Sequence, residues 1–332
     1  YTYYENGTDQ SVDRPISVAI DPELGRLILP EGATIGGRLI EVDYAYAFPG
    51  DLGGGPYNRR ASLPVDLATT VDWHAGVSRT IAAVDTEEIY ADLQQAIAAW
   101  NALPAGSVGL ITIMDSGSYG DALTGANGIQ LADGSVLYIV AADWPVIGEI
   151  ENVQAGERRP GRIVPSGVRP HIQSDLEITG SAAPESLTPG RLILNGLSFE
   201  GSVRVLAGNT GEVRVEHCLV TNGAEGDPTL AGAVIAEANP TPGVPGTYNE
   251  NLGLCLERSI ASRIDLRAAA GAGLLCRDSI VHDRPADPAT TAVAINAGSS
   301  RAEIESTTII GEARLQSVEA ENSIFYGPLT VE

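Results

Sequence analysis

The sequence predicts an all-β protein: a right-handed parallel β-helix with three strands per coil, preceded by an α-helical cap and a small, separate amino-terminal β module. Three observations support this fold class. A short pattern recurs through the carboxyl-terminal part, brief strand-like segments flank each copy, and glycine (38) and proline (20) are abundant among 332 residues. Such a composition favours short strands joined by tight turns over a helical bundle.

The repeat is clearest in two neighbouring segments, ESTTIIG and ENSIFYG. Each copy begins with two polar or turn-forming residues, continues with a mostly small or thiol residue, and ends with apolar residues and a turn. The third position recurs at intervals near twenty residues or their multiples, which is typical of a solenoid. The third positions are Leu197, Cys218, Ser259, Ser279, Thr307 and Ser323.

Each period contains three strand-like segments: one before the repeated pattern, one within it and one after it. These segments are short and lack crossover helices, which excludes a doubly wound sheet. Coils of a parallel β-helix stack at about 4.8 Å, so equivalent residues become vertical neighbours. The β-helix is expected over residues 107–332, with lateral loops at 223–251 and 284–291; the first loop also holds one strand, AVIA.

The remaining chain divides into three expected parts. Residues 1–60 form a β-rich module, because SVAIDPELGRLILP alternates like a hairpin and six of the eleven tyrosines lie in the first 57 residues. Residues 61–84 are a linker. Residues 85–106 form the capping helix, in which Asp85 and Glu88 make a capping-box-like start and Pro104 and Gly106 mark the end. The helical apolar face is Ile89, Leu93, Ile97 and Trp100.

Two resemblances follow from these segments. A helix followed by the strand pattern I-x-I-x-D-x-G-x-Y (111–119) resembles the amino-terminal cap and first coil of pectin-lyase-like β-helix proteins, over residues 85–332. VAIDPELGRLILP, DYAYAFPGDLGGGPY and coils of the form x-S-I-x resemble largely uncharacterised bacterial proteins associated with phage-tail-like contractile injection systems. The second resemblance implies a structural or attachment part rather than a metabolic enzyme.

Charge limits the partners. The net charge is −23, and all 20 basic residues are arginine. Such a surface repels nucleic acid and anionic membranes, and repels acidic polysaccharides unless a cation bridges them. The sequence has no apolar run long enough to span a membrane, so we expect a soluble chain in a cytoplasmic assembly or a released particle. Cys218, Cys255 and Cys276 lie among apolar residues and are expected as core thiols.

Two outward rows are predicted from strand alternation. Near the carboxyl-terminal end of the two rows, most positions are glutamate. Glu303, Glu305, Glu319 and Glu321 are expected to form a square of carboxylates there. Like charges this close either raise one another's pKa or hold a cation, which indicates a calcium site or an acid–base pair. The alternative, which we favour, is a solvated acidic stripe. The two rows are Asn195, Glu216, Glu257, Arg277, Glu305, Glu321 and Ile193, Arg214, Cys255, Leu275, Glu303, Glu319.

A second candidate site lies in RDSIVHDR, where Arg277, Asp278, His282 and Asp283 surround one coil. An acid, an imidazole and an arginine are the groups that proton abstraction next to a uronate carboxylate requires. The alternative, which we favour, is turn formation, because Asp278 and Asp283 lie at bend positions.

The expected function is a non-enzymatic structural or recognition component of a larger assembly, with protein partners or surface glycans and no cofactor. The polygalacturonase-like residue set and the arginine-plus-calcium pattern of pectate lyases are not recognisable, and the coils contain few aromatic residues for stacking on sugars. A polysaccharide lyase or hydrolase acting on the outer face is the first alternative. A carbohydrate-binding module working through loop 223–251 is the second.

Overall fold

The computed structural model describes residues 2–5, 8–11, 19–21, 26–28, 51–81, 88–144, 163–221, 234–237, 249–266, 272–283 and 291–331. The chain divides into two compact units, Tyr1–Phe48 and Pro49–Glu332. The boundary therefore lies earlier than the one expected at residue 60, because the residues that follow it bond to the larger unit.

The smaller unit contains two antiparallel hairpins. Strand β1 (Thr2–Glu5) pairs with β2 (Thr8–Ser11), and β3 (Ala19–Asp21) pairs with β4 (Arg26–Ile28). The second pair is the hairpin predicted from the alternation in SVAIDPELGRLILP, and Asp21 pairs with Arg26 at its end.

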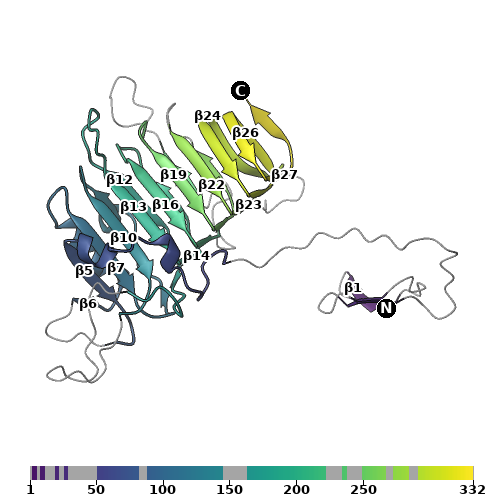
Figure 1. The fold of residues 1–332 in the computed structure, drawn as a ribbon, viewed down its shortest axis with the longest axis horizontal. Helices are drawn as coiled ribbons and strands as arrows, with labels where there is room; N and C mark the ends of the chain where they lie inside the picture. The colour runs from purple at the N-terminus through teal and green to yellow at the C-terminus, as the bar shows by residue number, and fades with distance from the viewer. Residues whose placement is uncertain are drawn as a thin grey trace. The chain divides into compact units, whose positions relative to one another are not determined.

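The larger unit is mainly β, and its long parallel sheets stack as in a β-helix (Figure 1). Consecutive strands belong to three rows, and each strand pairs in parallel with its counterpart in the next layer. Row one comprises β5 (Trp73–Val77), β7 (Val108–Ile113), β10 (Val136–Ala141), β13 (Arg191–Asn195), β16 (Glu212–Glu216), β19 (Gly253–Glu257), β22 (Gly273–Arg277) and the carboxyl-terminal halves of β24 (Val293–Glu305) and β26 (Glu312–Glu321).

The other two rows follow the same order. Row two comprises β8 (Ser118–Tyr119), β11 (His171–Ile172), β14 (Ser198–Phe199), β17 (Leu219–Val220), β20 (Ile260–Ala261), β23 (Ile280–His282), β25 (Thr308–Ile310) and β27 (Ile324–Tyr326). Row three comprises β9 (Ile129–Leu131), β12 (Leu176–Gly180), β15 (Val203–Val205), β18 (Val234–Ala236), β21 (Ile264–Leu266), the amino-terminal halves of β24 and β26, and β28 (Leu329–Val331). Strand β18 is the predicted AVIA strand.

The repeated pattern marks the corner between rows one and two. The residue before each third position takes a left-handed backbone conformation, with φ of 47–50° at the non-glycine corners. Left-handed residues reverse the chain direction sharply, so a single residue turns row one into row two. The corner residues are Gly196, His217, Arg258, Asp278, Ser306 and Asn322.

The third positions form a buried hydroxyl ladder, as vertical neighbours should. The Ser259 hydroxyl accepts the backbone N–H of Cys218 at 3.0 Å, and the Ser279 hydroxyl accepts that of Ser259 at 3.1 Å. Thr307 and Ser323 continue the ladder at 3.4 and 3.2 Å. The prediction that residues about twenty apart stack on one another is therefore confirmed at Ser259 and Ser279.

The core lies between the rows and is almost entirely aliphatic, as alternating burial along the strands requires.

Near the start of the stack, the carboxylate of Asp115 links neighbouring segments by hydrogen bonds. Asp115 accepts hydrogen bonds from the hydroxyls of Ser78 and Tyr119 at 2.7 and 2.8 Å and from the backbone N–H groups of Arg79 and Gly117. Burial raises the pKa of Asp115, but these hydrogen bonds outweigh it and hold the pKa below its usual value.

The helix expected at residues 85–106 is shorter than predicted. Helix α2 spans Leu93–Asn101, and its N-cap is Asp92, whose carboxylate accepts the Gln95 N–H at 2.9 Å. The prediction of a helical Ile89 is wrong, because that residue pairs with Gly76 in the short strand β6 (Ile89–Tyr90). Asp85 lies outside the described residues. Leu93, Ile97 and Trp100 are buried as predicted, and α2 contacts β5, β7 and β9.

A linker was expected at residues 61–84, and of these the structure describes 61–81, which do not form a free linker. The short helices η1 (Arg60–Ser62) and α1 (Leu67–Thr70) lead into β5, which is itself a member of the row. Leu63, Leu67 and Val71 bury the outward side chains Leu110 and Val140. The outer face of the first layers is therefore covered by residues 63–71.

The last described layer leaves its inward side chains open. Leu329 and Val331 align with the buried Ala313 and Leu315, yet they are 42 and 52% exposed. Phe325 and Val318 are only half-buried. Within the described part of the chain, no strand pairs with the outer edge of this layer.

Two further expectations are tested in part. Loop 223–251 is described only at residues 234–237 and 249–251, and residues 284–290 of the second loop lie outside the described residues. Among the described residues, no helix has the length and apolarity that crossing a membrane requires.

Candidate functional site

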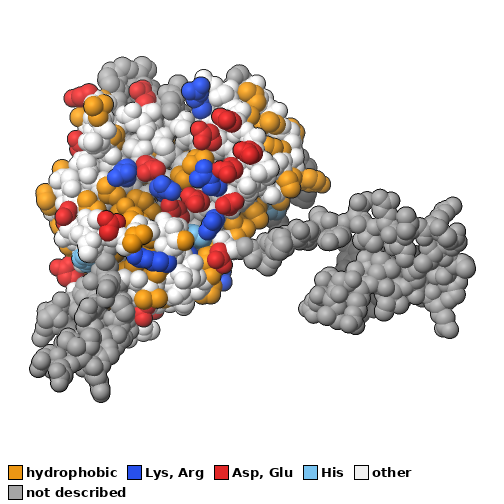
Figure 2. Space-filling model, viewed as in Figure 1, with side chains coloured by type: hydrophobic (Ala, Val, Ile, Leu, Met, Phe, Trp, Pro, Cys, Tyr) orange, Lys and Arg blue, Asp and Glu red, His pale blue; other side chains and the backbone are white. Residues whose placement is uncertain are grey.

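The two outward rows predicted from the sequence are present on row one. Asn195, Glu216, Glu257, Arg277, Glu305 and Glu321 align in register, as do Ile193, Arg214, Cys255, Leu275, Glu303 and Glu319. Acidic and basic side chains gather together over this part of the surface (Figure 2). The later layers of row one therefore present the most strongly charged uncovered sheet face.

The carboxylate square is assembled by register but is not set up for a metal. Glu303 aligns with Glu319 and Glu305 with Glu321 on adjacent strands. Glu305 is held by Arg277, whose Nε lies 2.6 Å from the carboxylate. Among the described residues, no group of three or more His, Cys, Asp or Glu side chains is placed to hold a metal ion.

Upstream on the same face, one arginine links three glutamates. Arg214 lies 2.9 Å from Glu216, 3.3 Å from Glu257 and 3.9 Å from Glu212. Glu216 is buried and also accepts a hydrogen bond from Asn195 at 3.1 Å. Burial raises the pKa of Glu216 above its usual value, although Arg214 and Asn195 oppose the shift. This ladder holds the strands in register and leaves little free capacity for a ligand.

The second candidate constellation is divided among separate structural contacts. Arg277 pairs with Glu305, and Asp278 lies at a left-handed corner 3.6 Å from Arg258. Asp283 accepts the backbone N–H of Val293 at 2.6 Å, and His282 is exposed. In the described part of the chain, no hydrogen bond or ion pair joins Asp278 to His282. The contacts of Asp278 and Asp283 are those of turn and strand-end residues.

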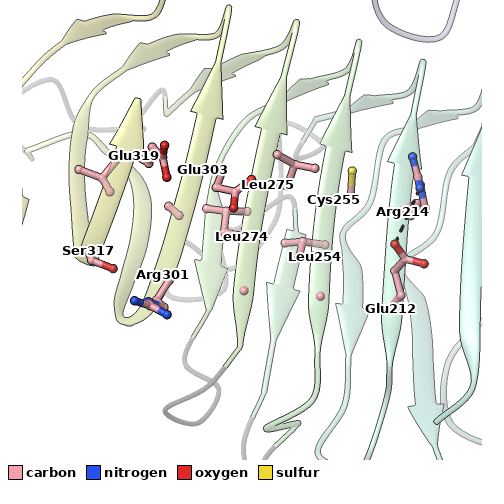
Figure 3. Close-up of a pocket in the computed structure, with 14 residues that line it drawn as sticks. Glu212, Arg214, Leu254, Cys255, Leu274, Leu275, Arg301, Glu303, Ser317 and Glu319 are labelled. Atoms are coloured by element: carbon pink, nitrogen blue, oxygen red, sulfur yellow. Dashed lines mark ion pairs between the residues drawn. The ribbon is translucent and has the colours of Figure 1, made fainter. Parts of the chain in front are cut away.

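A groove of about 610 Å³ lies on row one between the arginine ladder and the carboxylates (Figure 3). Glu212 and Arg214 form one wall, and Arg301 and Glu303 form the other. The floor is Gly253 and Gly273 from adjacent strands, together with the outward side chains Cys255 and Leu275. Burial raises the pKa of the Cys255 thiol to about 11, so the thiol stays protonated and weakly nucleophilic at neutral pH.

The two glycines were not identified from the sequence as site residues. Their signal is present, because GLCLE and GLLCR place glycine at the same point of adjacent repeats. Gly253 aligns with Gly273, two residues before Cys255 and Leu275 in the second outward row. The two glycines form a groove because larger residues flank them in the sheet. Glu212 aligns with Gly253 on one side, and Arg301 aligns with Gly273 on the other. The sequence alone does not reveal this alignment.

A second feature beyond the predictions is a strap, residues 51–59, across the corner of the middle layers. Arg59 is 1% exposed; it donates to Asn195 Oδ1 at 3.2 Å and to the backbone oxygens of Ala141 and Gly55. The Tyr57 hydroxyl lies 3.0 Å from His217 Nδ1, and the Gly53 N–H donates to Arg258 O at 2.8 Å. The DLGGG run (51–55) lies in this strap.

Comparison of the chain with protein-family models, with curated proteins and with solved structures finds no match.

Proposed function

We propose that the larger unit is a right-handed parallel β-helix with three strands per coil, closed at its start by α2. It serves as a rigid, non-enzymatic structural or recognition element of a larger assembly, such as a phage-tail-like particle. The support for the scaffold role is the set of hydrogen bonds and ion pairs that links successive layers.

The observation that carries this proposal is the hydrogen-bonded ladder that links successive layers. The hydroxyl of Ser259 accepts the backbone N–H of Cys218, and that of Ser279 accepts the backbone N–H of Ser259. Buried bonds repeated from layer to layer favour a rigid stack.

A second observation supports a structural role. Several charged side chains on this face are engaged in contacts between layers. Arg277 binds Glu305, and Arg214 binds Glu216 and Glu257. Rigid registration of strands is the property that such ladders supply.

The test is the particle state of the protein in its native cells. We expect the wild-type protein to sediment with a high-mass particle. A wild-type protein that sediments as a free monomer under all conditions contradicts the proposal.

The enzymatic alternative is checked separately. Purified protein is incubated with a panel of uronate polymers, and no turnover is expected. Turnover that disappears in Asp278→Asn and His282→Gln would establish a polysaccharide lyase in place of the scaffold.

A further inference from the structure

The groove on row one is kept open by glycine where the fold does not require glycine. Gly253 and Gly273 are the first residues of β19 and β22 and have no positive φ, so any residue fits their backbone. A Cβ built on Gly273 meets nothing within 4 Å, and one on Gly253 meets only the Gly211 oxygen at 3.7 Å. Glycine in a strand can mark a place where a ligand approaches the backbone closely.

The groove is a shallow trough of limited width. Strands β16 and β24, which carry its two walls, are three strand spacings apart, or about 14 Å between backbones. Between them, the bare peptide planes at the glycines and the half-buried Leu275 make a flat and partly apolar floor. A flat ring of modest size fits such a floor better than a bulky side chain or a helix does.

The far wall carries polar groups that the fold leaves unused. Arg301, Glu303 and Glu319 are exposed, and Ser317 of β26 lies beside them. Within the described residues, none of these four side chains makes a hydrogen bond or an ion pair, whereas Glu212 and Arg214 on the opposite wall are paired with each other at 3.9 Å. The open hydrogen-bonding capacity is therefore concentrated on one side of the floor.

The number of hydrogen-bond donors and acceptors among these four side chains indicates which kind of ligand fits the groove. The guanidinium only donates, the two carboxylates only accept, and the hydroxyl does both. An anion would use the donors and face two carboxylates in a chain of net charge −23. A cation would use the acceptors and face Arg301. Neighbouring hydroxyl groups both donate and accept, so they satisfy both kinds of group at once.

We propose that this groove binds an uncharged, hydroxyl-rich sugar ring of a neutral glycan. One ring face lies on Gly253, Gly273 and Leu275, and its hydroxyls bond to Arg301, Glu303 and Glu319. The site is distinct from loop 223–251 and from the coil around Asp278. It gives the scaffold a recognition surface and does not depend on the scaffold joining a larger assembly.

The experiment is a titration followed by calorimetry and by protein NMR. The probes are neutral hexasaccharides of β-1,4-glucan, β-1,3-glucan, β-1,4-mannan and α-1,4-glucan, with hexagalacturonate as the anionic comparison and chitosan hexamer as the cationic one. We expect at least one neutral hexamer to bind more tightly than either charged hexamer.

Gly273→Leu fills the trough, and its Cβ enters open space, so the protein should still fold. We expect it to weaken binding at least about tenfold through steric exclusion. The matched control, Thr308→Leu, adds the same side chain at an outward position of row two and should leave binding unchanged. Glu303→Gln with Glu319→Gln provides a second variant that alters only exposed side chains and should also weaken binding.

Three results would overturn the inference: no neutral hexamer binds at millimolar concentration, a charged hexamer binds best, or Gly273→Leu binds as the wild type does. Each is independent of whether the protein sediments with a particle.

Discussion

Residues of different chemistry take the same left-handed backbone conformation at the corner between row one and row two. Asp278, Asn322 and His217 belong to the residue types that are enriched at positive φ, whereas Arg258 does not. His217 is 2% exposed and faces Tyr57, Arg59, Arg258 and Asp51. The strap thus buries an imidazole beside two guanidinium groups.

This burial predicts a pH-dependent stability. Burial, reinforced by Arg258 and Arg59, lowers the pKa of His217 from 6.5 to about 4. The unfolded chain then binds the extra proton between these pH values, so the free energy of unfolding falls as the pH drops from about 6.5 towards 4. The loss attributable to His217 is on the order of 3 kcal/mol. Chemical denaturation at a series of pH values measures it.

His217→Asn is the matched variant, since asparagine accepts the left-handed corner. Its stability should depend less on pH in this window than that of the wild type, whereas His282→Asn, an exposed site, should change nothing. Identical pH slopes for the wild type and His217→Asn would show that the strap does not bury the imidazole.

At the scale of elements, short-range signals located the strands well and the start of the helix poorly. The strand pattern I-x-I-x-D-x-G-x-Y at 111–119 falls on β7 and β8. The apolar face of the helix was predicted from Leu93, Ile97 and Trp100, but Ile89 has the same spacing and lies in β6. Spacing alone cannot distinguish the two, because the N-cap at Asp92 interrupts the helix between them.

The cap itself gives a prediction. Asp92→Ala removes the acceptor of the Gln95 N–H and should lower the free energy of unfolding by about 1 kcal/mol. Asp92→Asn keeps an acceptor and should cost much less. Equal losses in the two variants, measured by thermal unfolding, would place the start of the helix elsewhere.

At the scale of the whole molecule, the repeat period of the sequence predicted the stacking of layers and the two outward rows. Both features follow from residues that recur once in each layer. It could not predict the strap, since Arg59 meets Asn195 across 136 positions without any periodic signal. The same holds for Leu63 and Leu67 covering Leu110. The groove was predictable only in part. Its two glycines occur at the same point of adjacent repeats, but the residues of its walls belong to other repeats.

The central claim is that rows of residues distant in sequence are vertical neighbours along one stack. Pulsed electron paramagnetic resonance tests it most directly, with spin labels attached through a non-natural amino acid at outward row-one positions. Pairs 191/301 and 212/317 each span four strand spacings and should both give about 19 Å, whereas 191/317 spans five and should give about 24 Å. Distances that do not increase with the number of layers would contradict the account.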